Sequence, residues 1–194
     1  MKRVTISPGL LVDEALHEAA SEGIGLYAPN CAPLTWDRFV APAGWWLVPD
    51  ETGDGYKAEC VLEDTQDRTI KINLWFLPDL RGGQKAQPHS HPWDFHAHVL
   101  LGGYNEDRYV PDGGTVRAER SVEHQAGAVN RVPIDVYHEV TQIHDPGRTL
   151  TLMVCGRGER GRWGYLDINT GTRVPVQPDP KFAARLRALN PHQY

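Results

Sequence analysis

The chain has 194 residues, a length that favours one domain with a core large enough to fold without disulfides. Its 25 acidic and 20 basic residues give a formal net charge of −5, which argues against a nucleic-acid partner, because such proteins need clustered Lys and Arg. No stretch approaches the roughly 20 apolar residues of a membrane span, and the first residues lack the apolar core of a signal peptide. Three cysteines that lie far apart, with no CxxC pair, are typical of a reduced, cytoplasmic protein.

Both ends of the chain are predicted to be helical. An N-terminal extension, residues 1–45, contains a Ser-Pro pair typical of a helix start, and apolar residues then recur at helical spacing over residues 7–22. In the C-terminal segment, residues 177–194, the apolar positions of 181–189 would share one face of a short helix. We expect this second helix to dock on the rest of the chain or on a partner subunit.

Between these segments, residues 46–176 are predicted to be all-β. Short apolar runs alternate with turn signals, and this regular recurrence is typical of a β-sandwich or barrel. The turn signals are Thr52–Gly55, Asp112–Gly114, Asp145–Gly147 and Asn169–Gly171.

The strand predicted over Ile70–Leu77 has two different faces, because successive side chains point to opposite sides. The two-residue alternation of the strand does not by itself decide which face meets the protein interior. If the mixed face points inward, Asn73 and Trp75 would line a ligand pocket and bind substrate; otherwise they decorate the exterior of a core strand. The apolar face holds Ile70, Ile72, Leu74 and Phe76, and the mixed face holds Lys71, Asn73, Trp75 and Leu77.

Four of the nine histidines crowd into residues 89–98. A packed core has little use for that density, because each buried imidazole needs a hydrogen-bond partner, whereas neutral imidazole suits most transition metals. Residues two apart on a strand share a face, so the cluster predicts a metal centre within β-structure. The four are His89, His91, His96 and His98, while His17, His124, His144 and His192 show no such spacing and are expected at the surface.

The spacing of this cluster resembles the first of two motifs of the cupin superfamily, small β-barrels that hold one metal ion. That motif reads G-x5-H-x-H-x3–4-E-x6-G. Gly83, His89, His91 and Gly103 fall at its positions, and His96 stands where the family usually has glutamate.

The second cupin motif, G-x5-P-x-G-x2-H-x3-N, also has a counterpart, and 23 residues separate it from the first, a normal interval for the family. Gly127, Pro133 and His138 match it, with Asp135 in place of the glycine and Gln142 in place of the asparagine. The resemblance implies a single cupin-type jelly-roll barrel and, as is common in the family, a homodimer.

The resemblance further implies that one divalent ion binds His89, His91, His96 and His138 at the barrel mouth. His98 could replace His96 as a ligand or act nearby as a catalytic acid or base. Neutral imidazoles leave the charge of the ion uncompensated, so the site should favour anionic or chelating substrates. Fe(II) is favoured by the resemblance to all-histidine cupin dioxygenases, although Zn, Ni, Mn, Co and Cu also suit imidazole.

The favoured function is therefore a non-haem Fe(II) dioxygenase acting on a small acidic or metal-chelating metabolite. A redox-neutral isomerase, epimerase or lyase, in which the ion is a Lewis acid, is the alternative. A 2-oxoglutarate-dependent hydroxylase would use His91, Asp94 and His138 as ligands and Arg148 for the co-substrate, but its usual H-x-D spacing is one residue shorter. A ligand-binding cupin without catalytic activity also stays open.

Three more residues near the motifs are candidates for the site. Arg148 could pair with a substrate carboxylate, or it is a solvated loop arginine. Asp94 could accept a hydrogen bond from a ligand imidazole, or it caps its own turn. Gln142 could support a ligand from the second motif.

Overall fold

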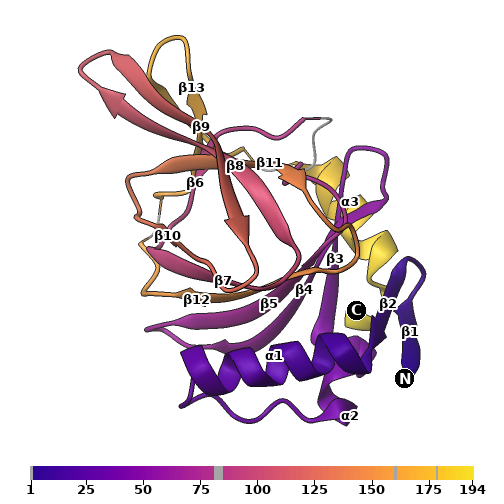
Figure 1. The fold of residues 1–194 in the computed structure, drawn as a ribbon. Helices are drawn as coiled ribbons and strands as arrows, with labels where there is room; N and C mark the ends of the chain where they lie inside the picture. Colours follow the sequence, from indigo (N-terminus) through magenta and orange to yellow (C-terminus); the bar gives the residue numbers. More distant parts are fainter. Residues whose placement is uncertain (1, 81–84, 160, 178) are drawn as a thin grey trace.

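Two six-stranded antiparallel sheets face each other and enclose a barrel interior (Figure 1). The computed structural model describes residues 2–80, 85–159, 161–177 and 179–194. The strand orders are β10-β7-β12-β5-β4-β3 and β14-β13-β6-β11-β8-β9, which confirms the predicted all-β jelly-roll class. In chain order the elements are β1 (Arg3–Ser7), β2 (Leu10–Asp13), α1 (Glu14–Tyr27), α2 (Trp36–Phe39), β3 (Trp45–Pro49), β4 (Gly55–Asp64), β5 (Thr69–Trp75), β6 (His89–Ser90), β7 (Phe95–Leu101), β8 (Gly103–Asp112), β9 (Thr115–Gln125), β10 (Val129–Val132), β11 (Tyr137–Ile143), β12 (Thr149–Cys155), β13 (Gly164–Asp167), β14 (Thr172–Pro175) and α3 (Pro180–Leu189), with short 3₁₀ turns at Pro42–Gly44 and Pro191–Gln193.

The N-terminal extension begins as a β-hairpin, so the prediction of a helix over residues 7–22 was wrong at its start. β1 and β2 pair antiparallel, and Gly9 in the turn between them has a φ of +83°, which favours glycine. Asp13 then caps α1, because its side chain accepts a hydrogen bond from the backbone N–H of Leu16 at 3.0 Å. The helical spacing of apolar residues holds only after the Asp13 cap, since Leu11 lies in β2, and α1 continues to Tyr27, beyond the predicted end.

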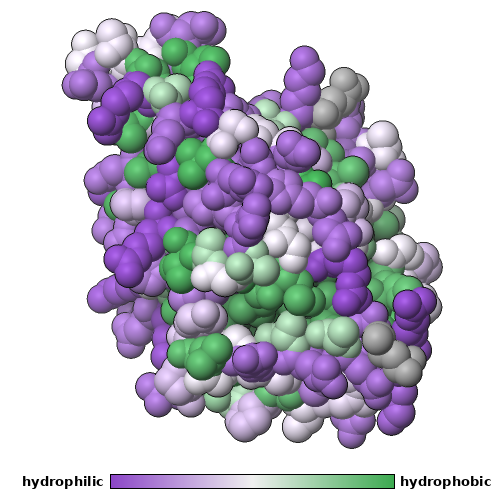
Figure 2. Space-filling model, viewed as in Figure 1, coloured by the Kyte–Doolittle hydropathy of each residue, from purple (hydrophilic) through white to green (hydrophobic). Residues whose placement is uncertain are grey.

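The main hydrophobic core lies between α1 and the outer face of the first sheet (Figure 1). Hydrophobic residues gather where α1 meets β4 and β5, with hydrophilic residues above them (Figure 2). Gly23 allows the close approach of the helix, since a Cβ atom there would lie 2.6 Å from the side chain of Leu100. The helix contributes Leu16, Ala20 and Ile24 to this core, and the sheet contributes Ile70, Ile72, Leu74, Leu150 and Leu152.

Leu152 is completely buried in this core, so its truncation should destabilise the fold strongly. We expect Leu152→Ala to lower the free energy of unfolding by about 2–5 kcal/mol, because it leaves a cavity beneath α1. Leu26→Ala is the control, since Leu26 lies on α1 but is 63% exposed, and its substitution should change stability by less than about 0.5 kcal/mol. Urea denaturation measures both, and a Leu152→Ala protein as stable as the wild type would contradict this account of the core.

β5 turns its mixed face toward the barrel interior. Ile70, Ile72 and Leu74 pack in the core beneath α1, whereas Lys71 and Trp75 line the interior. The large dry core between sheet and helix takes the purely apolar face, because burying its side chains there costs no unpaired polar group. Of the two orientations that the sequence left open for this strand, the structure therefore has the one with the mixed face inward.

The chain ends on β3, the edge strand of the first sheet. α3 packs against β3, and the fully buried Asn190 that follows it bonds the backbone of Leu47 in both directions. Its side chain accepts from the Leu47 N–H at 2.7 Å and donates to the Leu47 carbonyl at 2.8 Å. The amide thus satisfies backbone groups that an open sheet edge leaves unpaired. In the part of the chain that the structure describes, no helix has the length and apolar character needed to cross a membrane.

Candidate metal centre

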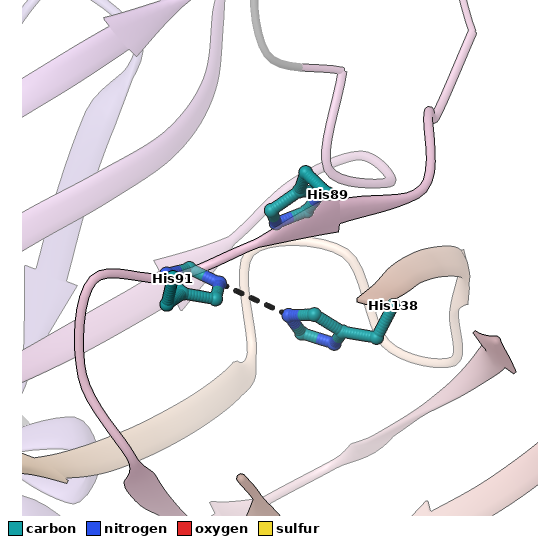
Figure 3. A group of neighbouring side chains, drawn as sticks. All are labelled: His89, His91 and His138. Atoms are coloured by element: carbon teal, nitrogen blue, oxygen red, sulfur yellow. Dashed lines mark hydrogen bonds between the residues drawn. The ribbon is translucent and has the colours of Figure 1, made fainter. Parts of the chain in front are cut away.

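Three histidines, one on β6, one just after it and one on β11, converge inside the barrel (Figure 3). β6 is only two residues long, and it is held between β13 and β11. His89 lies directly opposite His138 in the register of β6 and β11. His91 follows two residues later and points to the same side as His89. The ladder therefore brings together two motifs that are far apart in the sequence.

The geometry of the cluster fits a single ion. The Nε2 atoms of His91 and His138 lie 3.0 Å apart, and the ligand atoms of all three residues lie within 4.8 Å of one another. Two nitrogens bound to one ion at about 2.1 Å each would be roughly 3.0–3.4 Å apart. All three side chains are buried, with residue exposures of 0%, 8% and 5% for His89, His91 and His138.

Two of the rings are oriented by hydrogen bonds at Nδ1. The Nδ1 atom of His138 lies 2.9 Å from a carboxylate oxygen of Glu106, and that of His89 lies 2.9 Å from the carbonyl oxygen of Gln87. With the proton on Nδ1 in each ring, the Nε2 lone pair faces the centre of the cluster. An acceptor behind a ligand imidazole is the usual way in which proteins fix a metal-binding histidine.

Glu106 is the centre of a buried network that the motifs did not reveal. Its side chain is fully buried and also accepts hydrogen bonds from Asn130, at 2.8 Å, and His124, at 3.1 Å, and it pairs with Arg108. Burial alone would raise the pKa of Glu106, but the hydrogen bonds from His124 and His138 and the charge of Arg108 hold it well below its usual range. The prediction of His124 as a surface residue was wrong, since this residue is 8% exposed.

A sequence signal for Glu106 exists in the alternation of β8. Tyr104 and Glu106 are two residues apart, so they share a face, and both side chains are buried. An acidic residue at an inward position of a strand needs a buried partner. The register that places β8 beside β11 supplies that partner in His138, and the motifs carry no information about this register.

His96 does not join the cluster, which corrects the expectation of a fourth histidine ligand. β7 begins at Phe95, whose ring faces inward and lies 4.8 Å from the ring of His91 and 5.6 Å from that of His138. Because strand side chains alternate, His96 must point outward, and it is exposed. The motif position of the usual glutamate is thus on the wrong face of the strand here.

His98 lies on the same outer face, which corrects its expected role as a catalytic acid or base. Its ring stacks on Tyr27 of α1 with centroids 3.9 Å apart and an angle of 14° between the ring planes. Burial between sheet and helix lowers its pKa, and the neighbouring His96 lowers it further. The residue therefore contributes to the packing of α1 and has no access to the cluster.

Three other expected site residues are also turned away from the cluster. Arg148 forms an ion pair with Asp13 at the start of α1, at 2.7 Å, so its guanidinium is directed away from the site where a substrate carboxylate would bind. Asp94 accepts from the backbone N–H of Ile134 and holds a loop, while Gln142 is exposed beyond a bulge in β11. These placements also remove the ligand set and the arginine of the 2-oxoglutarate alternative.

The first cupin motif begins and ends with a glycine, and the structure explains the need for the second of these, Gly103. A Cβ atom at Gly103 would lie 2.7 Å from Nδ1 of His144 and 2.8 Å from the carbonyl oxygen of His124, so a side chain would collide there. Gly83, the first position of the motif, lies outside the described residues.

The inner cavity beside the histidines has a volume of about 30 Å³. Trp75 lines it, and its indole N–H donates to Thr151 Oγ1 at 3.1 Å. Asn73 points to the same side but is completely covered, with its amide 2.8 Å from the sulfur of Met153. Of the two candidates on β5, Trp75 therefore reaches the cavity and Asn73 supports its wall.

Asp79 is a second carboxylate near the cluster that the sequence did not single out. It is 2% exposed, lines the inner cavity, and has Oδ2 at 3.7 Å from Nε2 of His89. The hydroxyl of Tyr56 donates to its Oδ1 at 2.8 Å, and Lys57 Nζ lies 4.0 Å from its Oδ2. The backbone N–H of Asp79 is bound to the carbonyl of Val140 at 3.1 Å, which fixes the position of the carboxylate.

Comparisons with known proteins by structure find neighbours of low similarity. By sequence, no family and no curated protein matches the chain. By structure, the chain is similar to KdgF from Halomonas sp. (12% identity, 54% of this chain and 83% of that chain, TM-score 0.37). It is also similar to a cupin superfamily protein from Desulfitobacterium hafniense DCB-2 (14%, 52% and 77%, TM-score 0.36) and to an RmlC-like cupin from Shewanella frigidimarina NCIMB 400 (14%, 55% and 81%, TM-score 0.36). The last two are described as cupins, but all three have low identity, cover about half of this chain and have TM-scores below 0.5, so neither fold nor function is taken from them.

Proposed function

We propose that this protein is a metal-dependent enzyme in which His89, His91 and His138 hold one divalent ion. The observation that carries the proposal is the convergence of three buried imidazoles, two of them with an acceptor behind Nδ1. Three protein ligands leave coordination positions for a substrate, which is typical of catalytic rather than structural metal sites. A small molecule entering from the barrel mouth is the expected substrate.

The ion we favour is Fe(II), and the reaction we favour is the oxygenation of an acidic or metal-chelating metabolite. When bound, Fe(II) would supply the redox chemistry that oxygen requires. The chain would supply a dry wall, because Phe95, Val140 and Met153 line the inner cavity and are at most 7% exposed. Neutral imidazoles leave the charge of the ion available to an anionic substrate.

Redox-neutral chemistry is the second candidate, and Asp79 is the observation that favours it. Its carboxylate lies beside the cluster and is held by Tyr56 Oη–H at 2.8 Å. In an isomerase or lyase, Asp79 Oδ2 would take a proton from substrate and become a neutral carboxylic acid, while the Tyr56 hydroxyl, which donates to Oδ1, holds the group in place. Zn, Ni, Mn, Co or Cu would then serve as a Lewis acid as well as iron.

One experiment separates these candidates. Protein purified anaerobically without added metal would be analysed for its elements, and oxygen uptake would be followed with an electrode when Fe(II) and candidate acids are supplied. We expect about one iron per chain and substrate-dependent oxygen uptake. One zinc, nickel or manganese without oxygen uptake would favour the redox-neutral reaction, and no bound metal in any preparation would refute the proposal.

A further inference from the structure

The inner cavity is too small for a whole substrate. Its volume of about 30 Å³ has room for one or two water-sized groups beside the histidines. Lys57, Lys71 and His91 line both this cavity and a much larger groove of about 1090 Å³, so the two spaces meet at these residues. A molecule that reaches the cluster must therefore place a small head in the cavity and its body in the groove.

The groove is walled mainly by aromatic and aliphatic side chains. β3 and β4 form one side, the segment 161–165 forms another, and α3 covers the outer end. A site of this volume matches those that hold drug-sized ligands and bury most of their surface. Its apolar side chains include Trp46, Tyr56, Trp93, Trp163, Phe182 and Leu186.

Two lysines, Lys57 buried and Lys71 partly buried, mark the point where the groove meets the inner cavity. Lys57 Nζ lies 2.8 Å from one carboxylate oxygen of Glu59, and Lys71 Nζ lies 3.0 Å from the other. The lysine side chains are only 4% and 15% exposed. Burial alone would raise the pKa of Glu59, but Lys57 and Lys71 hold it well below its usual range, so the carboxylate is charged and is shared by two cations.

The balance of charge at this junction favours an anion once an ion is bound. Lys57 and Lys71 contribute two positive charges, and Glu59 and Asp79 contribute two negative charges. The three histidine ligands are neutral when they bind metal, and Glu106 beside His138 is balanced by Arg108. Counted over the described residues, a divalent ion therefore leaves the junction with a net charge of about +2. At the outer end of the groove, Asp179 pairs with Arg185 at 3.8 Å and does not alter this balance.

We infer that the substrate is an amphipathic carboxylic acid: its carboxylate lies at the junction of Lys57, Lys71 and the histidine cluster, and its apolar body lies in the groove against Trp46, Trp163 and Phe182. This inference rests on the proposed function for the metal-bound state of the site. It extends that proposal from a small acid to an acid with a sizeable apolar part.

Binding of simple probes tests both halves of the inference. Octanoate, acetate and octan-1-ol would be titrated into the full-length protein, as purified and after chelation, with tryptophan fluorescence and calorimetry as readouts. We expect octanoate to bind at least about 100-fold more tightly than acetate, because its chain is removed from water. We expect octanoate to bind at least about 10-fold more tightly than octan-1-ol in the metal-loaded protein, because only its carboxylate is attracted by the positive charge at the junction.

Variants with matched controls locate the two contacts. Trp163→Ala should weaken octanoate binding about 10-fold, whereas Ile168→Ala, which changes another exposed apolar residue outside the groove, should leave it unchanged. Lys71→Gln should remove most of the preference for octanoate over octan-1-ol, and Lys2→Gln, on the exposed N-terminal segment, should retain it. Circular dichroism would verify that each variant is folded.

The outcomes separate this inference from the proposed function. A protein that holds its metal but binds octanoate no better than acetate, or no better than octan-1-ol, would overturn the inference and leave the metal site intact. A protein that binds no metal would overturn the proposed function, while a high ratio of octanoate to acetate affinity would still support the groove as the site of an apolar chain. A dimer that dissociates in Trp163→Ala, with no preference for octanoate, would show that a second copy covers the groove and would also overturn the inference.

Discussion

His91→Ala and His138→Ala proteins are expected to lose their metal. Each substitution removes one of three ligand nitrogens, so we expect the affinity for a divalent ion to fall by more than about 100-fold, beyond the loss seen when only a supporting residue is changed. Elemental analysis of the purified proteins and competition with a chelator measure the effect. A thermal melt of each variant, recorded without metal, checks that the barrel is folded.

His96→Ala is the matched control for this prediction. His96 belongs to the same histidine-rich segment and stands at a motif position, but its side chain is exposed on the outer face of β7. We expect this variant to retain full metal content. Full metal content in His91→Ala, or its loss in His96→Ala, would mean that the ion is not held by the three converging imidazoles.

Glu106→Gln should weaken metal binding without removing a ligand. The glutamine amide has nearly the shape of the carboxylate but carries no charge, so it holds the Nδ1–H of His138 less firmly and leaves Arg108 without its anion. Loss of such an anchor typically costs about 10–100-fold in metal affinity. We also expect a lower free energy of unfolding, by about 1–3 kcal/mol, since a buried charged network loses its centre.

Glu123→Gln is the control for Glu106→Gln. Glu123 lies on β9, the neighbour of β8 in the same sheet, and its side chain is 53% exposed. We expect its substitution to change neither metal affinity nor stability measurably, because exposed charges contribute little. If Glu106→Gln kept the wild-type affinity in chelator competition, the carboxylate would have no part in positioning His138.

The sequence by itself determined the class of fold and the three histidines at its centre. Turn signals at regular intervals indicate strands, and these follow from local backbone preferences that need no tertiary contacts. His89 and His91 share a face for the same local reason, since strand side chains alternate. The cupin motif spacing added His138, and the structure places its ring beside the other two.

Only the tertiary structure decided which other residues reach the site. Alternation holds within one strand, but the chain passes through a loop between His91 and Phe95, and the phase is not carried across it; this is why His96 and His98 face outward. Glu106 reaches His138 through the pairing of β8 with β11, and Asp79 is placed by its backbone bond to Val140 of β11, which is distant in the sequence. Strand register and sheet packing depend on the whole chain, because each strand takes the position that buries its apolar face against other elements. These contacts join residues far apart in the sequence, so no local sequence pattern predicts them.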